Sequence, residues 1–149
     1  LIGRGCFVTA VEPSDKLRQL GATLTNQKVS WLNDSLPSLA KVKQQSHCFD
    51  LILLSAVWMH VPLEQRQEAL ISMSSLLKCQ GTLIVTLRHG EFSDGRASFG
   101  VSVSDLEQMG KQAQLSVSHV ASGEDLLNRE DVSWQTVVLQ KECLKANKD

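Results

Sequence analysis

The sequence predicts an α/β domain with a mostly parallel β-sheet and an antiparallel strand at its C-terminal edge. Two segments, FDLILLSAV (residues 49–57) and TLIVTL (residues 82–87), are apolar almost without interruption, as strands covered on both faces require. Strand-like segments alternate with segments that repeat apolar residues every three to four positions, which is typical of parallel strands joined by helices. The last two strand-like segments have no full helix between them, which indicates antiparallel pairing.

The N-terminal part of the chain is predicted to run strand, helix, strand, short helix. A β-rich segment at residues 7–12 precedes Ser14, a favoured N-cap residue, and an acidic residue in the expected first turn. The helix has one apolar face, made by Leu17, Leu20 and Leu24. A second strand is expected at residues 29–32, followed by a turn and a short helix that ends before His47.

A central strand is expected at residues 49–57, and Pro62 then suits the first position of a helix. The inner face of that helix is predicted to be Ala69, Leu70, Met73, Leu76 and Leu77. After the strand at residues 82–87, residues 90–100 contain three glycines and no apolar period, so they form a loop long enough to cover or shape a site.

Ser104 and Glu107 have the spacing of a capping box and predict a further helix. The final strands are expected at residues 115–120 and 132–139. The polar stretch between them has the pattern of a turn of helix at residues 124–128.

Composition is that of one globular domain spanning residues 1–149, because 42% apolar residues in a chain of this length can bury a sizeable core. The 15 basic and 16 acidic residues nearly cancel, so charge favours neither nucleic acid nor an anionic membrane as a partner. The longest apolar run is far shorter than the roughly 20 residues that cross a bilayer, and the N-terminus lacks a signal-peptide pattern. A cytoplasmic location is expected.

No C-x-x-C spacing occurs among the four cysteines, Cys6, Cys48, Cys79 and Cys143. This scatter favours reduced, mostly buried thiols over a disulfide framework or a zinc site. His47 and His119 lie near no carboxylate at ligand spacing, so no metal is predicted.

Three blocks carry a resemblance to an enzyme family: VTAVEPS (residues 8–14), FDLILLSAVWMHVP (residues 49–62) and LLKCQGTLIVTLRHG (residues 76–90). In order and spacing they resemble the class I S-adenosylmethionine-dependent methyltransferases, over nearly the whole chain. The resemblance implies a Rossmann-like three-layer sandwich, S-adenosylmethionine as cofactor, and methyl transfer to a small-molecule acceptor by in-line displacement. The terminal DVSWQTVVLQK (residues 131–141) resembles the antiparallel seventh strand of that fold.

The family's first strand and glycine-rich loop are missing upstream of Glu12. Gly3 and Gly5 do not replace that loop, because they run into a strand instead of opening a helix, and residues 1–5 are interpreted as the tail of the preceding helix. If the family strand order 3-2-1-4-5-7-6 applies, the absent strand is the central one, and two inner edges lack a partner. We therefore expect a piece of a longer protein, or a homodimer in which each copy fills the other's gap.

The resemblance implies two groups of cofactor ligands. Glu12 ends the first strand, where a carboxylate can accept hydrogen bonds from the ribose hydroxyls, although it is also a helix-flanking charge. Asp34, in NDSLP, is implied to accept from the adenine amine, with Ser35 supplying backbone contacts. Asx-turn capping of the following helix is the competing interpretation of Asp34.

Three small residues end the central strand where the family's chain passes beside the methionine part of the cofactor: Ser55, Ala56 and Val57. Trp58 follows them as a candidate wall of the substrate pocket, with core packing as the alternative. Trp134, in the last strand, is interpreted as a core residue rather than a ligand contact.

His60 follows the central strand, and Arg88 and His89 end the next one, so the predicted topology places all three at one crevice. Both histidines are candidate catalytic bases, because an imidazole can remove a proton from an O–H or N–H nucleophile. Arg88 is a candidate substrate ligand, because its planar fork suits a carboxylate or a phosphate. A helix cap for His60 and a solvated loop pair for the other two are the alternatives.

Two other functions stay open. A nicotinamide-dependent oxidoreductase would use Glu12 equally well at its cofactor ribose, although the succession of blocks at residues 49–62 and 76–90 is typical of methyltransferases. A non-catalytic domain that keeps the fold for assembly is favoured by the missing glycine-rich loop.

Overall fold

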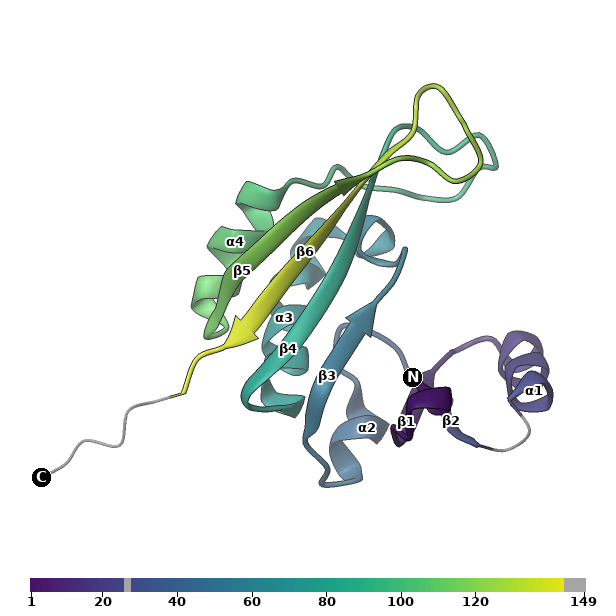
Figure 1. Ribbon diagram of the computed structural model, residues 1–149, viewed down its shortest axis with the longest axis vertical. Helices are drawn as coiled ribbons and strands as arrows, with labels where there is room; N and C mark the ends of the chain where they lie inside the picture. Colours follow the sequence, from purple (N-terminus) through teal and green to yellow (C-terminus); the bar gives the residue numbers. More distant parts are fainter. Residues whose placement is uncertain (26–27, 144–149) are drawn as a thin grey trace, which may run out of the picture. The chain divides into compact units, whose positions relative to one another are not determined.

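The computed structural model describes residues 1–25 and 28–143. They divide between His47 and Cys48 into two compact units. Each unit has its own β-sheet, two-stranded in the first and four-stranded in the second (Figure 1). The single domain predicted over residues 1–149 stays a prediction.

The first unit has the predicted order of elements. They are a 3₁₀ turn η1 (Ile2–Arg4), β1 (Val8–Val11), α1 (Asp15–Leu24), β2 (Val29–Leu32) and α2 (Ala40–Gln44). β1 and β2 pair in parallel, with Val8 opposite Val29. Ser14 is the N-cap of α1 and its side chain accepts from the backbone N–H of Leu17, as predicted.

The apolar face of α1 is exposed. Leu17, Leu20 and Leu24 are 57%, 55% and 73% exposed. The helix instead approaches β2 through Gly21, where an added Cβ would lie only 2.4 Å from the ring of Trp31. A bulky indole on β2 needs a residue without a side chain opposite it, and that requirement rotates the leucines away from the strand.

The second unit contains β3 (Phe49–Leu54), a 3₁₀ turn η2 (Trp58–His60), α3 (Leu63–Leu76), β4 (Leu77–His89), α4 (Val103–Gln112), β5 (Leu115–Gly123) and β6 (Ser133–Lys141). Its sheet has the strand order β3-β4-β6-β5, and only β6 runs against its neighbours. A parallel sheet with one antiparallel C-terminal strand is therefore confirmed. The prediction that this strand lies at the edge is wrong, because β6 lies between β4 and β5 (Figure 1).

The core of the second unit lies between its sheet and the helices α3 and α4. Alternate residues of β4 and β6 point into it and are completely buried: Leu83, Val85, Leu87, Val137 and Leu139. All five residues of the predicted inner face of α3 are at most 5% exposed, although the last of them, Leu77, is already the first residue of β4.

The prediction that β3 is covered on both faces is wrong. Leu51 and Leu53 are 37% and 52% exposed, because they stand beside Thr82 and Ile84, on the face of the sheet opposite the core. Its continuous apolar pattern predicted the strand correctly but did not show that only one of its faces meets the core.

Three local predictions need correction. Ser102, not Ser104, is the N-cap of α4 and accepts from the backbone N–H of Asp105 at 3.0 Å. β4 begins at Leu77, immediately after α3, rather than at residue 82. Residues 124–128 form a turn rather than a turn of helix.

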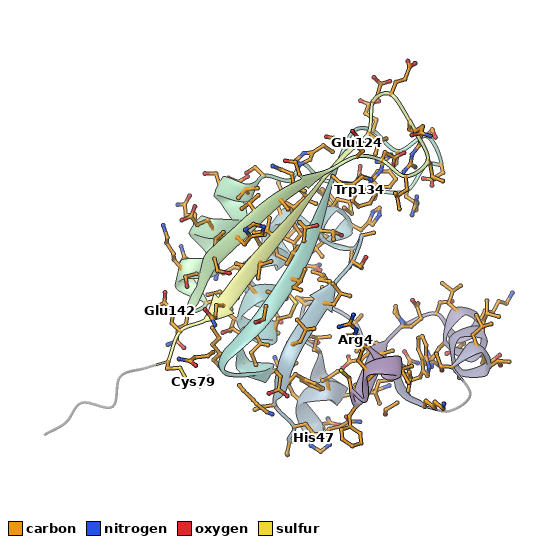
Figure 2. The ribbon with its side chains drawn as sticks, viewed as in Figure 1. Arg4, His47, Cys79, Glu124, Trp134 and Glu142 are labelled. Atoms are coloured by element: carbon orange, nitrogen blue, oxygen red, sulfur yellow. A yellow bond between two sulfur atoms is a disulfide. The ribbon has the colours of Figure 1, made fainter. Side chains whose placement is uncertain are left out.

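The prediction of four reduced, mostly buried cysteines is also wrong. Cys79 and Cys143 form a disulfide, with Cα atoms 5.3 Å apart, whereas Cys6 and Cys48 are free and exposed. Antiparallel pairing is the physical reason, because it places the first residues of β4 beside the end of β6. Figure 2 shows Cys79 and Glu142 at this end of the sheet.

Within the described ranges no helix is long and apolar enough to span a bilayer. The same residues contain no group of three His, Cys, Asp or Glu side chains that could hold a metal ion.

Gly90 offers a test of the turn that follows β4. It has φ of 102°, and an added Cβ would lie 2.1 Å from the carbonyl oxygen of Asp131. We expect Gly90→Ala to lower the free energy of unfolding by about 2 to 4 kcal/mol, through backbone strain and collision with a main-chain atom. Urea denaturation measures the effect.

Gly95→Ala is the matched control. Gly95 also has a positive φ, 76°, but no atom lies within 4 Å of an added Cβ, so strain alone acts and costs about 1 kcal/mol. Equal losses in the two variants would show that the contact with Asp131 is not present.

Candidate active site

A pocket of about 110 Å³ opens at the end of the second unit where β3 and β4 finish. These strands are parallel, so their carboxyl ends meet there, and antiparallel β6 begins at the same end. The lining residues come from three segments far apart in the sequence: Ala56, Met59 and His60; Arg88, Phe92 and Arg96; Arg129 and Trp134. Trp134 lies at this end in Figure 2.

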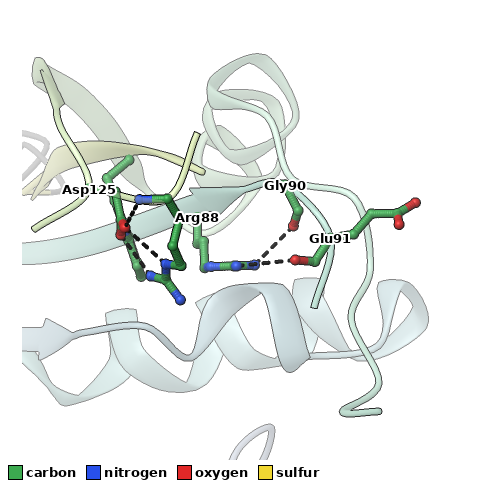
Figure 3. A network of polar contacts seen from close by, with 6 residues as sticks. Arg88, Gly90, Glu91 and Asp125 are labelled. Carbon is green, nitrogen blue, oxygen red and sulfur yellow. Dashed lines mark hydrogen bonds and ion pairs between the residues drawn. The ribbon is translucent and has the colours of Figure 1, made fainter. Parts of the chain in front are cut away.

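Arg88 is the most buried charged residue of the pocket wall, at 7% exposure. Its Nη1 and Nη2 donate to the backbone carbonyls of Gly90 and Glu91 at 3.0 and 3.1 Å (Figure 3). Its Cζ lies 3.9 Å from the ring centre of Phe92. Its Nε is buried without a hydrogen-bond partner among the described residues. The predicted substrate ligand therefore lies in the pocket.

Asp125 organises the opposite wall. Its carboxylate accepts from Nε and Nη2 of Arg129 at 2.9 and 2.7 Å and from the indole N–H of Trp134 at 3.0 Å (Figure 3). These bonds, those from Arg129 first, hold the pKa of Asp125 well below its ordinary value, and the same pairing raises the pKa of Arg129. Trp134, predicted as core, is thus a half-buried pocket residue.

His60 is held in one orientation. Its Nδ1 lies 2.7 Å from the carbonyl oxygen of Ala97, and its ring centre lies 4.8 Å from that of Phe92. A carbonyl oxygen can only accept, so we assign the proton to Nδ1, which leaves the lone pair of a neutral ring on Nε2. The predicted base therefore lies in the pocket with a nitrogen able to take a proton.

The loop of residues 90–100 is anchored by Arg66, a buried residue of α3. Its guanidinium donates to the carbonyls of Val61, Phe99 and Gly100 at 3.0, 3.3 and 2.7 Å. Burial lowers the pKa of Arg66, and the negative charge of Asp105 acts against that shift.

Trp58 belongs to this anchor rather than to the pocket wall. It is 1% exposed, and the guanidinium of Arg66 lies 5.4 Å from its ring centre. The structure therefore supports core packing, the alternative to its predicted contact with substrate.

His89 does not join His60 and Arg88. Successive residues of a strand point to opposite faces, so His89 faces away from Arg88. Its Nε2 lies 2.7 Å from Oε1 of Gln135 on β6, and it is not among the lining residues. Arg88 and His89 could share a crevice only if a β-bulge turned both side chains to one face, and the register of β4 with β6 is regular at these residues.

The predicted cofactor segment after β3 is accessible. Ser55, Ala56 and Val57 are all exposed, and Ala56 lines the pocket. Ala56 has φ of 56°, a left-handed conformation that is uncommon for residues other than glycine, and its N–H donates to Oγ1 of Thr86 at 2.7 Å. The chain leaves β3 here with a sharp, side-chain-supported turn.

Glu12 follows β1 directly in the first unit. Its backbone N–H donates to Leu32, and its Oε1 accepts from the backbone N–H of Ser14 at 2.8 Å. One carboxylate oxygen thus supports the start of α1, while a carboxylate has about four acceptor positions in all. The ribose role of Glu12 stays a prediction.

Asp34 caps a helix, as the competing interpretation has it. Its Oδ2 accepts from the backbone N–H groups of Lys41 and Val42 at 2.8 and 3.0 Å, and its Oδ1 accepts from that of Ser35 at 2.9 Å. Both oxygens therefore serve the backbone around α2. The predicted adenine contact of Asp34 and Ser35 is not tested by these bonds.

Sequence reasoning missed Phe92, Arg96, Asp125 and Arg129. A signal existed for the first two, because they lie in the glycine-containing loop predicted to shape a site. Asp125 and Arg129 are four residues apart in a segment that looks like ordinary polar surface. Only the pairing of β6 with β4 brings them beside Arg88.

The chain matches a family of enzymes. A family model described as a methyltransferase domain matches residues 1–85, more than half of the chain. The chain therefore belongs to the methyltransferase domain family, and the resemblance seen in the sequence is confirmed. No curated protein sequence matches significantly.

Solved structures of methyltransferases share the fold. An N-methyltransferase from Bradyrhizobium japonicum has a TM-score of 0.69 at 14% identity, and the match covers 91% of this chain and 74% of that one. A SAM-dependent methyltransferase from Methanosarcina mazei has a TM-score of 0.73 at 11% identity, with 95% and 84% covered. Magnesium protoporphyrin IX methyltransferase from Synechocystis, solved with bound SAM, has a TM-score of 0.69 at 14% identity. That match covers 94% of this chain and 62% of the other.

The Asp125 cluster predicts a pH dependence of stability. A carboxyl group whose pKa is lower in the folded than in the unfolded state contributes fully above its ordinary value, near 3.8, and loses its contribution as pH falls toward the folded value. We expect Asp125→Asn to lower the urea midpoint of unfolding at pH 7. The difference in midpoint between this variant and the native chain is expected to shrink progressively below pH 3.8.

Asp131→Asn is the control, because it removes the same charge from an exposed nearby position. Its urea midpoint is expected to follow that of the native chain at every pH. A constant difference between Asp125→Asn and the native chain from pH 7 to pH 2.5 would contradict the cluster.

Proposed function

We propose that the protein transfers a methyl group from S-adenosylmethionine to a small-molecule acceptor. The observation that carries the proposal is the pocket at the carboxyl ends of β3 and β4, in a chain of the methyltransferase family. Ligands of open α/β sheets bind at this end of the strands. The pocket holds a candidate base, His60, beside a candidate ligand, Arg88.

Residues of both units suit the cofactor. In the second unit, the exposed segment of Ser55, Ala56 and Val57 offers accessible backbone at the carboxyl end of β3. In the first unit, Glu12 offers a carboxylate directly after β1, and Asp34 and Ser35 follow β2. When bound, the cofactor supplies a methyl group that its sulfonium sulfur already activates.

The chain's own contribution is alignment, proton transfer and exclusion of water. Nε2 of His60 takes the proton of an O–H or N–H nucleophile, while the bond from Nδ1 to Ala97 keeps the ring from turning. Arg88 orients the acceptor from a fixed position. His89 and Trp58 have no part in this proposal, since one faces away and the other is core.

Cofactor use is tested by isothermal titration of the natural full-length polypeptide with S-adenosylhomocysteine and, separately, with NADH. We expect S-adenosylhomocysteine alone to bind, and Glu12→Ala to weaken it by about 1 to 3 kcal/mol, the range for a lost polar contact. The matched control is Glu68→Ala, at an exposed position of α3.

Binding of NADH instead would favour the oxidoreductase. An unchanged affinity in Glu12→Ala would remove Glu12 from the cofactor site.

A second candidate function, assembly, is favoured by the strand edges. β1 pairs only with β2, and β3 pairs only with β4, so each strand has one side without a strand partner among the described residues. Exposed edges of this kind template pairing with another strand. We propose that these edges take up a strand, from a longer form of the polypeptide or from a second copy in a homodimer.

Light scattering and thermal unfolding test this assembly on residues 1–149. We expect a dimer or larger species, or a non-cooperative melt that becomes cooperative in a longer polypeptide. A monodisperse monomer with a cooperative melt would refute both forms of the assembly.

We propose a cytoplasmic location, as the sequence analysis expects. The Cys79–Cys143 disulfide argues the other way, because such bonds persist mainly in oxidising compartments. Alkylation of cysteines in fresh cell extract decides between the two.

A further inference from the structure

Positive charge in the pocket wall is only partly matched. Arg96 pairs with Asp94, whose Oδ2 accepts from its Nε at 2.7 Å, and Arg129 pairs with Asp125. Arg88 pairs with no carboxylate among the described residues, because its guanidinium donates to two backbone carbonyls. A lone cation at 7% exposure is costly unless a counter-charge reaches it.

Two further observations point to an anion. Nη1 and Nη2 of Arg88 each donate one hydrogen to a backbone carbonyl and keep a second one, whereas its Nε is buried without an acceptor within the described part of the chain. Arg88 and Arg96 also contact the same ring, with Cζ atoms 3.9 and 4.8 Å from the centre of Phe92. Like charges gathered around one ring repel each other, and a negative group bound near them would offset both charges.

The size of the pocket limits the ligand. A volume of about 110 Å³ is small beside the roughly 300 to 1,000 Å³ of pockets that enclose whole ligands. This volume, formed by residues of the second unit alone, is enough for one charged group and its immediate neighbours. Ala56 and Trp134 supply apolar surface for the part of the ligand next to that group.

We propose that this pocket binds an oxyanion, a carboxylate or a phosphate monoester, carried by the methyl acceptor. The proposal rests on the proposed function and narrows its substrate to small anionic molecules. Arg88 and Arg96 bind the oxyanion, because a guanidinium matches both groups with paired N–H donors. Arg129 is not assigned to the oxyanion, because both oxygens of the buried Asp125 hold its guanidinium. Asp94 holds the guanidinium of Arg96 through Oδ2 alone, at an exposed position.

The test uses ¹⁵N-labelled full-length protein titrated with inorganic phosphate and, separately, with benzoate. Each titration is done with and without saturating S-adenosylhomocysteine. We expect saturable shifts of the Trp134 indole N–H and the arginine Nε–H signals with at least one probe. The tighter probe identifies the oxyanion as phosphate or carboxylate.

Two variants change the charge in opposite directions. Arg96→Gln, at a side chain 60% exposed, is expected to weaken the tighter probe at least tenfold. Asp94→Asn keeps an oxygen for the backbone N–H of Arg96 but frees its guanidinium, and is expected to tighten that probe several-fold.

Lys111→Gln is the matched control, because it removes one positive charge from the same unit at a side chain of α4 that is 67% exposed. Its effect is expected to be less than twofold. Equal weakening by Arg96→Gln and Lys111→Gln would show general charge attraction and overturn the site, as would the absence of saturable shifts.

The titrations with saturating S-adenosylhomocysteine distinguish a failure of this inference from a failure of the proposed function. Displacement of the probe by S-adenosylhomocysteine would assign the pocket to the cofactor's own carboxylate and overturn the acceptor site. Probe binding that persists with bound S-adenosylhomocysteine supports it. If the probe binds while S-adenosylhomocysteine does not bind at all, the proposed function fails and the oxyanion site stands.

Discussion

The geometry of the pocket depends on the burial of one cation, Arg66. A guanidinium that is 1% exposed must have hydrogen-bond acceptors, and three backbone carbonyls supply them. One carbonyl belongs to Val61, beside η2, and the other two end the loop of residues 90–100. The loop is therefore tied back to the start of α3, which keeps Phe92 and Arg96 beside the carboxyl end of β4.

The second constraint is the pairing of β4 with β6. Its register sets Arg88 opposite Trp134, so both side chains stand on the same face of the sheet. Trp134 in turn binds Asp125, and Asp125 fixes Arg129. Because β6 runs antiparallel between β4 and β5, the polar turn before it, which contains Asp125 and Arg129, forms one wall of the pocket.

Strong periodic signals predicted the elements well. The inner face of α3, the strands and the N-cap at Ser14 follow from local chemistry that neighbours do not overrule. Predictions failed where the neighbours of a helix or strand determine which of its side chains are buried. Leu17 on α1 is exposed because Gly21 faces Trp31, and Leu51 on β3 is exposed because it stands on the face of the sheet opposite the core.

The sequence by itself determined the family, the order of strands and helices, and the positions of His60 after the first strand of the second unit and of Arg88 near the end of the next. Only the tertiary structure decided which side chains meet. In the structure His89 faces away from Arg88, and Cys79 is bonded to Cys143. Trp58 is buried in the core, and Arg129 lines the pocket. The physical reason is that spacing in the chain specifies local conformation, whereas strand register and the need to satisfy buried charges specify contacts between distant segments.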